Sequence, residues 1–248
     1  MADLRNYQAR AGSAPSRVDT SIDQGLRAYM IRVYNLMAVG LVITGLAAWG
    51  AFSFSVTPDG HLTQFGALMF QSAFKWVVIF APLALVFFLS FRIGSMSVPA
   101  AQTTFWVYAA LVGLSLAVLF LVYTQTSIVR TFFITAASFG ALSLYGYTTR
   151  RDLSGIGSFL IMGVFGIIIA SIVNIFLASS ALQFAISVIG VLVFAGLTAY
   201  DTQQIKEMYY EGDGEVVAGR KAIMGALRLY LDFINLFMFL LQFMGDRR

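Results

Sequence analysis

The stretch IGSFLIMGVFGIIIASIVNIFL, residues 156–177, decides the fold class, because it contains no charged side chain. A helix that spans the hydrocarbon core of a bilayer needs about 20 predominantly apolar residues, which is the length available here. Residues 182–200 follow after a short gap and are equally free of charge. Two such stretches in succession predict two membrane-spanning helices.

The composition of the whole chain agrees with this prediction. Hydrophobic residues make up 59% of the 248 residues and charged residues only 11%, whereas soluble domains carry about 25% charged residues. The mean hydropathy is +0.81. Too little polar surface remains to cover a water-soluble globule, so the composition excludes a soluble enzyme, a disordered chain and a nucleic-acid-binding module.

Seven apolar stretches can be found along the chain, and they predict an all-α integral membrane protein whose partner is the lipid bilayer. They comprise residues 33–56, 76–91, 104–123, 131–147, 156–177, 182–200 and 227–244. We therefore expect a seven-helix transmembrane domain over residues 29–248. Residues 1–28 are polar and predict a disordered cytoplasmic tail, near whose end Ser21 and Gln24 have the spacing of a capping box that opens a helix.

The basic residues predict the orientation of the chain. Most of the 16 Lys and Arg residues lie in segments that are cytoplasmic if the N-terminus is inside, as the positive-inside rule requires. Seven spans then place the C-terminus outside. A re-entrant seventh segment would bring both ends inside, and the terminal Arg247–Arg248 pair leaves that alternative open. The chain has no cysteine, which excludes disulfides and thiolate metal sites.

Two acidic residues stand at the edges of predicted spans. Asp201 directly follows the sixth apolar stretch, and Asp232 lies six residues into the seventh. An aspartate at the centre of a spanning helix costs about 2.5–3.5 kcal/mol on insertion scales, so even a peripheral one needs a reason. The sixth and seventh helices run in opposite directions, which places both carboxylates near the cytoplasmic margin and within reach of each other.

Two carboxylates at that distance are expected to share one proton, because both cannot ionise cheaply. Loss of the proton would push the helices apart, so the pair predicts a pH sensor and ion gate near physiological pH. Once ionised, Asp201 and Asp232 offer hard oxygen ligands. Together with Asn235, Gln204 or backbone carbonyls they predict a weak, transient Ca²⁺ site suited to permeation.

Structural roles are the alternative for these residues. Asp201 could cap a helix end at the water boundary, and Asp232 could pair with Arg228, four residues earlier on the same helix face. Arg92 follows a short apolar stretch and predicts either a gating counter-ion for Asp201 or an interfacial anchor that extends to the headgroups.

Polar and small residues inside the apolar stretches predict helix packing. Asn174, with Ser171 one turn before it, is expected to hydrogen-bond between helices. Several glycines are expected where helices approach closely, namely Gly163, Gly166, Gly190 and Gly196.

Several motifs, in order, resemble the Bax inhibitor-1 family (transmembrane Bax inhibitor motif proteins) over residues 25–245. They are YGYTTRRDLS at 145–154, GSFLIMG at 157–163, IASIVN at 169–174, AYDTQ at 199–203 and LYLDFIN at 229–235. The resemblance implies a seven-helix bundle in which the seventh helix is central, surrounded by the other six, and a pH-dependent Ca²⁺ leak. It also implies that Asp201 and Asp232 form the pH-sensing pair and that Arg92 is the arginine able to bond to Asp201.

The chain departs from some family members in two respects. Its second apolar stretch contains no acid, although some members carry a glutamate there. It ends at GDRR without the lysine-rich tail of many eukaryotic members. The chain therefore resembles the bacterial branch, for which the inner membrane is the expected location.

The sequence thus predicts a pH-sensitive cation leak channel, not an enzyme, with Ca²⁺ as the permeant ion, no tightly bound cofactor and no nucleic-acid partner. One alternative is an intramembrane aspartyl protease, although Tyr230-Leu231-Asp232 replaces the Gly-x-Gly-Asp motif of presenilin-like enzymes. Another is a non-conducting regulator that binds a second membrane protein, such as a membrane protease. The oligomeric state stays open, and a monomer is plausible.

Overall fold

The structure is a computed structural model that describes residues 17–248, with side chains from residue 24 onward. It is helical, and no β-strand is formed within those residues. The helices are α2 (Arg17–Ser55), α3 (Gln64–Phe70), α4 (Phe74–Arg92), η1 (Ile93–Ser95), α5 (Val98–Leu116), α6 (Leu119–Val122), α7 (Gln125–Thr148), α8 (Ser154–Leu177), α9 (Ser180–Glu207) and α10 (Glu215–Met244). Seven candidate spans are present in the described chain, with α5 and α6 forming one of them, which confirms the predicted fold class.

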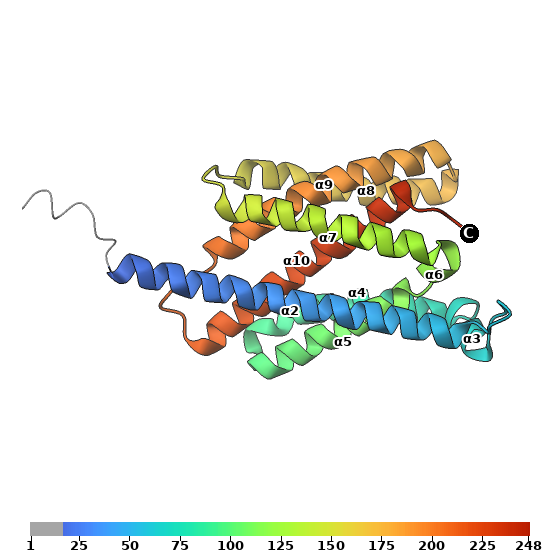
Figure 1. The fold of residues 1–248 in the computed structure, drawn as a ribbon, viewed down its shortest axis with the longest axis horizontal. Coiled ribbons are helices and arrows are strands. Elements are labelled where there is room, and N and C mark those ends of the chain that lie inside the picture. Colours follow the sequence, from blue (N-terminus) through green and yellow to red (C-terminus); the bar gives the residue numbers. More distant parts are fainter. Residues whose placement is uncertain (1–16) are drawn as a thin grey trace, which may run out of the picture.

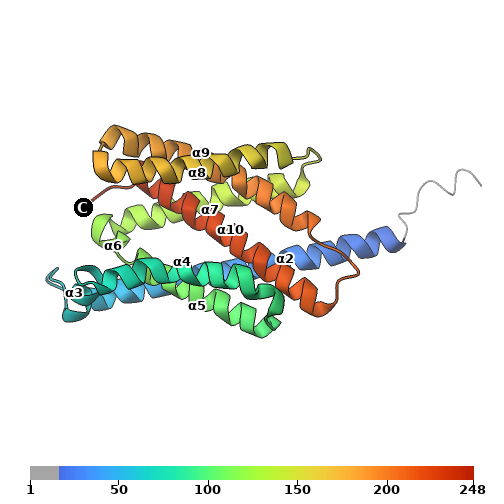
Figure 2. The same cartoon turned by 180° about the vertical axis from the view of Figure 1, so that it is seen from behind.

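The helices form two layers with one helix between them. Figures 1 and 2 show α2, α4 and α5 on one side and α7, α8 and α9 on the other, while α10 crosses obliquely between the two groups. The connection from α9 to α10 lies at the same end of the bundle as the start of α2 and the connection from α7 to α8. We call this end the α9–α10 loop end.

Helix α10 is the most buried of the seven candidate spans. In its most apolar stretch 61% of the residues are buried, against 11–39% in the corresponding stretches of the other six spans. Its extensive contacts are with α2, α5, α7 and α9. Helices α4 and α8 lie outside this set and pack mainly on α5 and α9 respectively. These contacts do not confirm the prediction that the seventh helix is surrounded by all six others.

Tyr230 anchors α10 to the first layer. Its side chain is fully buried, and its hydroxyl lies 2.6 Å from the Thr44 hydroxyl of α2. Thr44 itself donates to the carbonyl of Ala109 in α5 at 2.8 Å, so Tyr230 is the donor in the first bond. The Tyr230 ring also meets Phe105 and Tyr108 edge-on, with ring centroids 5.7 Å apart in both pairs. Three helices thus meet at one phenol.

Replacement of Tyr230 by phenylalanine is expected to lower the free energy of unfolding by about 0.5–1.5 kcal/mol, because it removes one buried hydrogen bond and keeps the aromatic contacts. Thermal unfolding of the purified protein in detergent would measure the loss. Tyr145→Phe is the control, since Tyr145 is 50% exposed. Equal stability of the two variants would contradict this role for the Tyr230–Thr44 bond.

Glycines allow two of the helix contacts to be made by backbone. A Cβ at Gly146 of α7 would collide with the Ala199 carbonyl of α9, and a Cβ at Gly113 of α5 would collide with the Thr44 carbonyl of α2. The predicted packing role is confirmed for Gly163, Gly190 and Gly196, where a Cβ would meet a side chain of another helix, and is wrong for Gly166, which faces open space.

The helices extend beyond the apolar stretches that predicted them. Helix α2 begins at Arg17 rather than near Ser21, so residues 17–28 of the predicted tail are helical, while the rest of that tail lies outside the described residues. Residues 17–28 contain no proline and a single glycine, so nothing in them interrupts a helix. Helix α9 likewise continues to Glu207, and α10 begins as early as Glu215.

Candidate functional site

Asp201 and Asp232 face each other between α9 and α10. Each carboxyl group lies within hydrogen-bonding range of the other. Asp232 is only 4% exposed, and its Oδ2 atom has no hydrogen-bond partner among the described residues. The predicted proximity of the two acids is therefore present in the structure. Asp201 is not at the end of its helix, as the apolar stretch had suggested, because α9 continues to Glu207.

Arg228 is the cation that acts on this acid pair. Its charge interacts with both carboxylates, although the guanidinium is exposed and forms no direct ion pair with either acid in the described chain. The side chain lies one helical turn before Asp232, at the spacing that the sequence analysis considered. An exposed positive charge near a buried acid pair can shift the balance between its protonated and ionised forms without forming an ion pair.

Arg92 is not brought to the acid pair. It is the last residue of α4, it is exposed, and α4 packs mainly on α5 rather than on α9 or α10. The contact predicted between Arg92 and Asp201 is absent from the described residues. The physical reason is that α4 is an outer helix of the opposite layer, so α10 lies between it and α9 (Figure 2).

A chain of hydroxyl groups joins α2, α7 and α9 and was not predicted. The Tyr34 hydroxyl of α2 lies 2.6 Å from Ser143 Oγ of α7, which lies 2.9 Å from Thr202 Oγ1 of α9. Thr202 donates to the Thr198 carbonyl at 2.7 Å. Each earlier hydroxyl therefore donates to the next, and the chain ends one residue from Asp201. Single hydroxyls in apolar stretches give no sequence signal, because any of them can bond to its own helix.

The predicted auxiliary residues Asn174 and Asn235 form their hydrogen bonds with groups other than the two acids in the described chain. Asn174 Nδ2 donates to Gln183 at 3.1 Å, and Gln183 in turn donates to Gln242 of α10 at 2.7 Å. These amides link α8, α9 and α10 near the opposite end of the bundle. Asn235 donates to the Leu231 carbonyl of its own helix at 2.8 Å.

The acid pair alone is a sparse metal site. No group of three or more His, Cys, Asp or Glu side chains that could hold a metal ion occurs in the residues described. Two carboxylates supply at most four oxygens, whereas Ca²⁺ takes about 6–8. Any Ca²⁺ held here would keep part of its water shell, which suits a short-lived contact.

The chain is similar to a known family and to proteins of several bacteria. The sequence pattern of the family described as Inhibitor of apoptosis-promoting Bax1 matches residues 26–248. An uncharacterised protein of Rickettsia prowazekii is 54% identical, over 92% of this chain and 93% of its own length. The inner membrane protein YbhL of Escherichia coli is 47% identical, over 90% of this chain and 94% of its own length.

A less similar relative also matches over nearly the whole length of both chains. An uncharacterised membrane protein of Streptococcus pyogenes is 36% identical, over 91% of this chain and 96% of its own length. The matches run through all seven spans and are to bacterial proteins. Together with the helical bundle and the motifs around Asp201 and Asp232, they show that this multi-pass membrane protein belongs to the Bax inhibitor-1 family, in its bacterial branch.

Proposed function

We propose that the protein is a pH-sensitive cation leak channel, with Ca²⁺ as the permeant ion and the Asp201–Asp232 pair as its sensor and gate. The observation that carries the proposal is the burial of Asp232, whose carboxylate is 4% exposed and has one oxygen without a partner in the described chain. Ionisable side chains inside a membrane domain are costly, and they commonly mark ion or proton pathways. A purely structural acid would be expected to have its hydrogen bonds satisfied.

One shared proton closes the gate in this mechanism. With the proton present, a hydrogen bond joins the two carboxyl groups and holds α9 against α10. Without it, two negative charges face each other, and at about 4 Å their repulsion is on the order of 4 kcal/mol for an effective dielectric constant of about 20. The repulsion separates the helices and admits water. A hydrated cation then passes between the carboxylates, and no bound cofactor or covalent step takes part.

Arg228 sets the range in which the gate responds. Its charge favours the ionised pair, so we propose that Arg228, rather than Arg92, is the principal counter-ion. Asp152, in the loop before α8, does not contribute to the response. Hydrogen bonds from the Ser154 side chain and backbone lower the pKa of the Asp152 carboxyl, which therefore stays ionised at neutral pH.

We also propose that the N-terminus is cytoplasmic and that the chain resides in a bacterial inner membrane. The excess of basic residues on that side supports the orientation. The related protein YbhL is an inner membrane protein. In this orientation the acid pair responds to cytoplasmic pH.

Calcium entry into liposomes that hold the purified protein tests the proposal. Flux is measured with an enclosed calcium indicator between about pH 6 and about pH 8, beside empty liposomes. We expect flux above the empty liposomes that rises with pH as the shared proton is lost. Folded protein without flux at any pH would overturn the proposal and favour a regulator of another membrane protein. Cleavage of a membrane peptide by the same preparation would favour a protease.

A further inference from the structure

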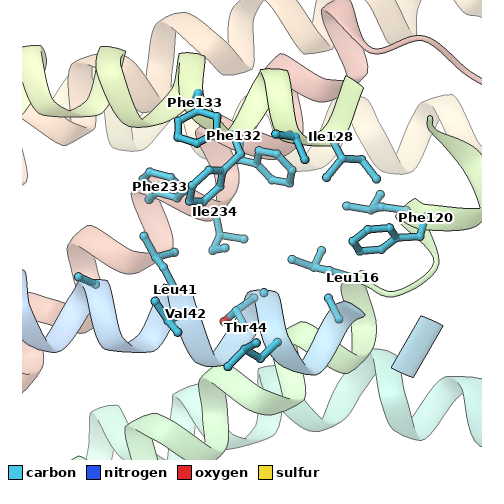
Figure 3. A pocket seen from close by; sticks show the side chains of 17 residues that line it. Leu41, Val42, Thr44, Leu116, Phe120, Ile128, Phe132, Phe133, Phe233 and Ile234 are labelled. Carbon is cyan, nitrogen blue, oxygen red and sulfur yellow. The ribbon is translucent and has the colours of Figure 1, made fainter. Parts of the chain in front are cut away.

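A lateral groove separates α2 from α7. Two cavities of about 600 Å³ and about 500 Å³ lie between these helices, with α10 behind the larger one. Figure 3 shows Phe132 and Phe133 of α7 on one side, Leu41 and Val42 of α2 on the other, and Phe233 between them. Helix α7 packs on α9 and α10 rather than on α2. We call the two cavities together the α2–α7 groove.

The groove runs along most of the membrane thickness. On α2 its lining extends from Arg27 to Ala48, which corresponds to about 31 Å at the helical rise of 1.5 Å per residue. The hydrocarbon core is about 30 Å thick. Several side chains along the groove are open to the surroundings, among them Val42, Leu46, Phe133 and Leu144, which are 60–66% exposed. An opening at this depth faces acyl chains, not water.

The inner wall of the groove offers few free polar groups. Tyr34 and Ser143 line the smaller cavity, but their hydroxyls are bonded to each other at 2.6 Å, and Ser143 is also bonded to Thr202. In the larger cavity the Thr44 hydroxyl is bonded to Tyr230 and Ala109. The wall is therefore chemically matched to a hydrocarbon chain.

The end of the groove at the α9–α10 loop end is positively charged. Arg27 lines the smaller cavity, is exposed, and forms no ion pair with a described residue. Tyr147 lines the same cavity, and Lys206 contacts it twice, since its ammonium donates to the Tyr147 carbonyl at 2.9 Å and lies 5.4 Å from the ring centre. Two cations from α2 and α9 thus flank the mouth of an apolar groove.

We propose that the α2–α7 groove binds one anionic phospholipid, with its phosphate beside Arg27 and Lys206 and one acyl chain between α2 and α7. The charge at the mouth selects a net negative headgroup, and the apolar wall accepts the chain. The site itself does not depend on ion conduction.

Native mass spectrometry of the purified full-length protein tests the proposal, with palmitoyl-oleoyl phosphatidylglycerol titrated against the phosphatidylcholine of the same chains. We expect tighter binding of phosphatidylglycerol. Gly140 lines the smaller cavity, and a Cβ at this position meets nothing within 4 Å, so the Gly140→Leu variant should fold. Its leucine side chain would occupy the space of the lipid chain, and the affinity for phosphatidylglycerol should fall about tenfold. Gly166→Leu, on the lipid face of α8, is its control and should bind like the unmodified protein.

Arg27→Gln should weaken phosphatidylglycerol binding about fivefold, which is the effect of one basic residue near an anionic surface. Arg32→Gln removes a charge from the same helix but on the face toward α5, where Arg32 lines a different depression, and should change little. Equal effects of Arg27→Gln and Arg32→Gln would overturn the proposal in favour of general surface attraction. Unchanged binding in Gly140→Leu, or equal binding of the two lipids, would also overturn it.

Discussion

Asparagine in place of Asp232 is expected to abolish the pH dependence of calcium flux. The amide mimics the protonated acid in shape and can hydrogen-bond to Asp201, but it cannot gain a negative charge. The repulsion that separates α9 from α10 then never arises, so flux should stay at the low value that the unmodified protein shows at acidic pH. A single lost charge interaction of about 1.4 kcal/mol corresponds to a tenfold change in a two-state population. We therefore expect a difference of about tenfold or more at the alkaline end.

The liposome assay described above measures this difference, and Asp152→Asn is the matched control. Asp152 is an exposed acid whose carboxyl already stays ionised at neutral pH because of its bonds to Ser154. Its replacement removes one carboxylate near the same end of the bundle and should leave the pH profile unchanged. A profile for Asp232→Asn that follows that of the unmodified protein would refute the gating role of the pair.

Leucine in place of Gly146 is expected to be the most destabilising single substitution considered. A side chain here meets the Ala199 backbone of α9, which cannot rotate away as a side chain could. The two helices would have to separate, and overpacking of this kind typically costs 1–3 kcal/mol or more. For a chain of this size a loss of 1–3 kcal/mol corresponds to a fall in the unfolding temperature of roughly 2–12 °C.

Thermal unfolding in detergent would show this fall, with Gly140→Leu as the control on the same helix. The control introduces the same side chain six residues earlier, at a position that faces open space. Gly146→Ala should be intermediate between glycine and leucine. If Gly146→Leu and Gly140→Leu unfold at the same temperature, the close approach of α7 and α9 is not a source of stability.

The number and order of the spans could be predicted because hydrocarbon imposes a length and a composition on each one. The ends of the helices could not, since an apolar stretch reports only the part of a helix that lies in lipid. Helices α9 and α10 continue beyond the apolar stretches, which places Asp201 and Asp232 farther from the helix ends than the apolar pattern suggested.

The candidate site was predictable to a similar degree. An acid beside an apolar stretch is a strong signal, so Asp201 and Asp232 were identified, and antiparallel neighbours in the chain were expected to bring them together. The prediction for Arg92 shows what the sequence alone does not give, namely which helices are neighbours. Charge and depth suggested a partner for Asp201, but which helices are neighbours depends on side-chain packing across the bundle, and α4 packs on α5 instead.

The two helix layers of the bundle cannot be joined until α10 has been synthesised. The most buried span is also the last of the seven in chain order, so six spans leave the ribosome and enter the membrane before the helix that joins the two layers exists. Until then Thr44 and Phe105 lack the Tyr230 side chain against which they pack. For most of its synthesis the nascent protein can form its two helix layers but lacks the helix that joins them.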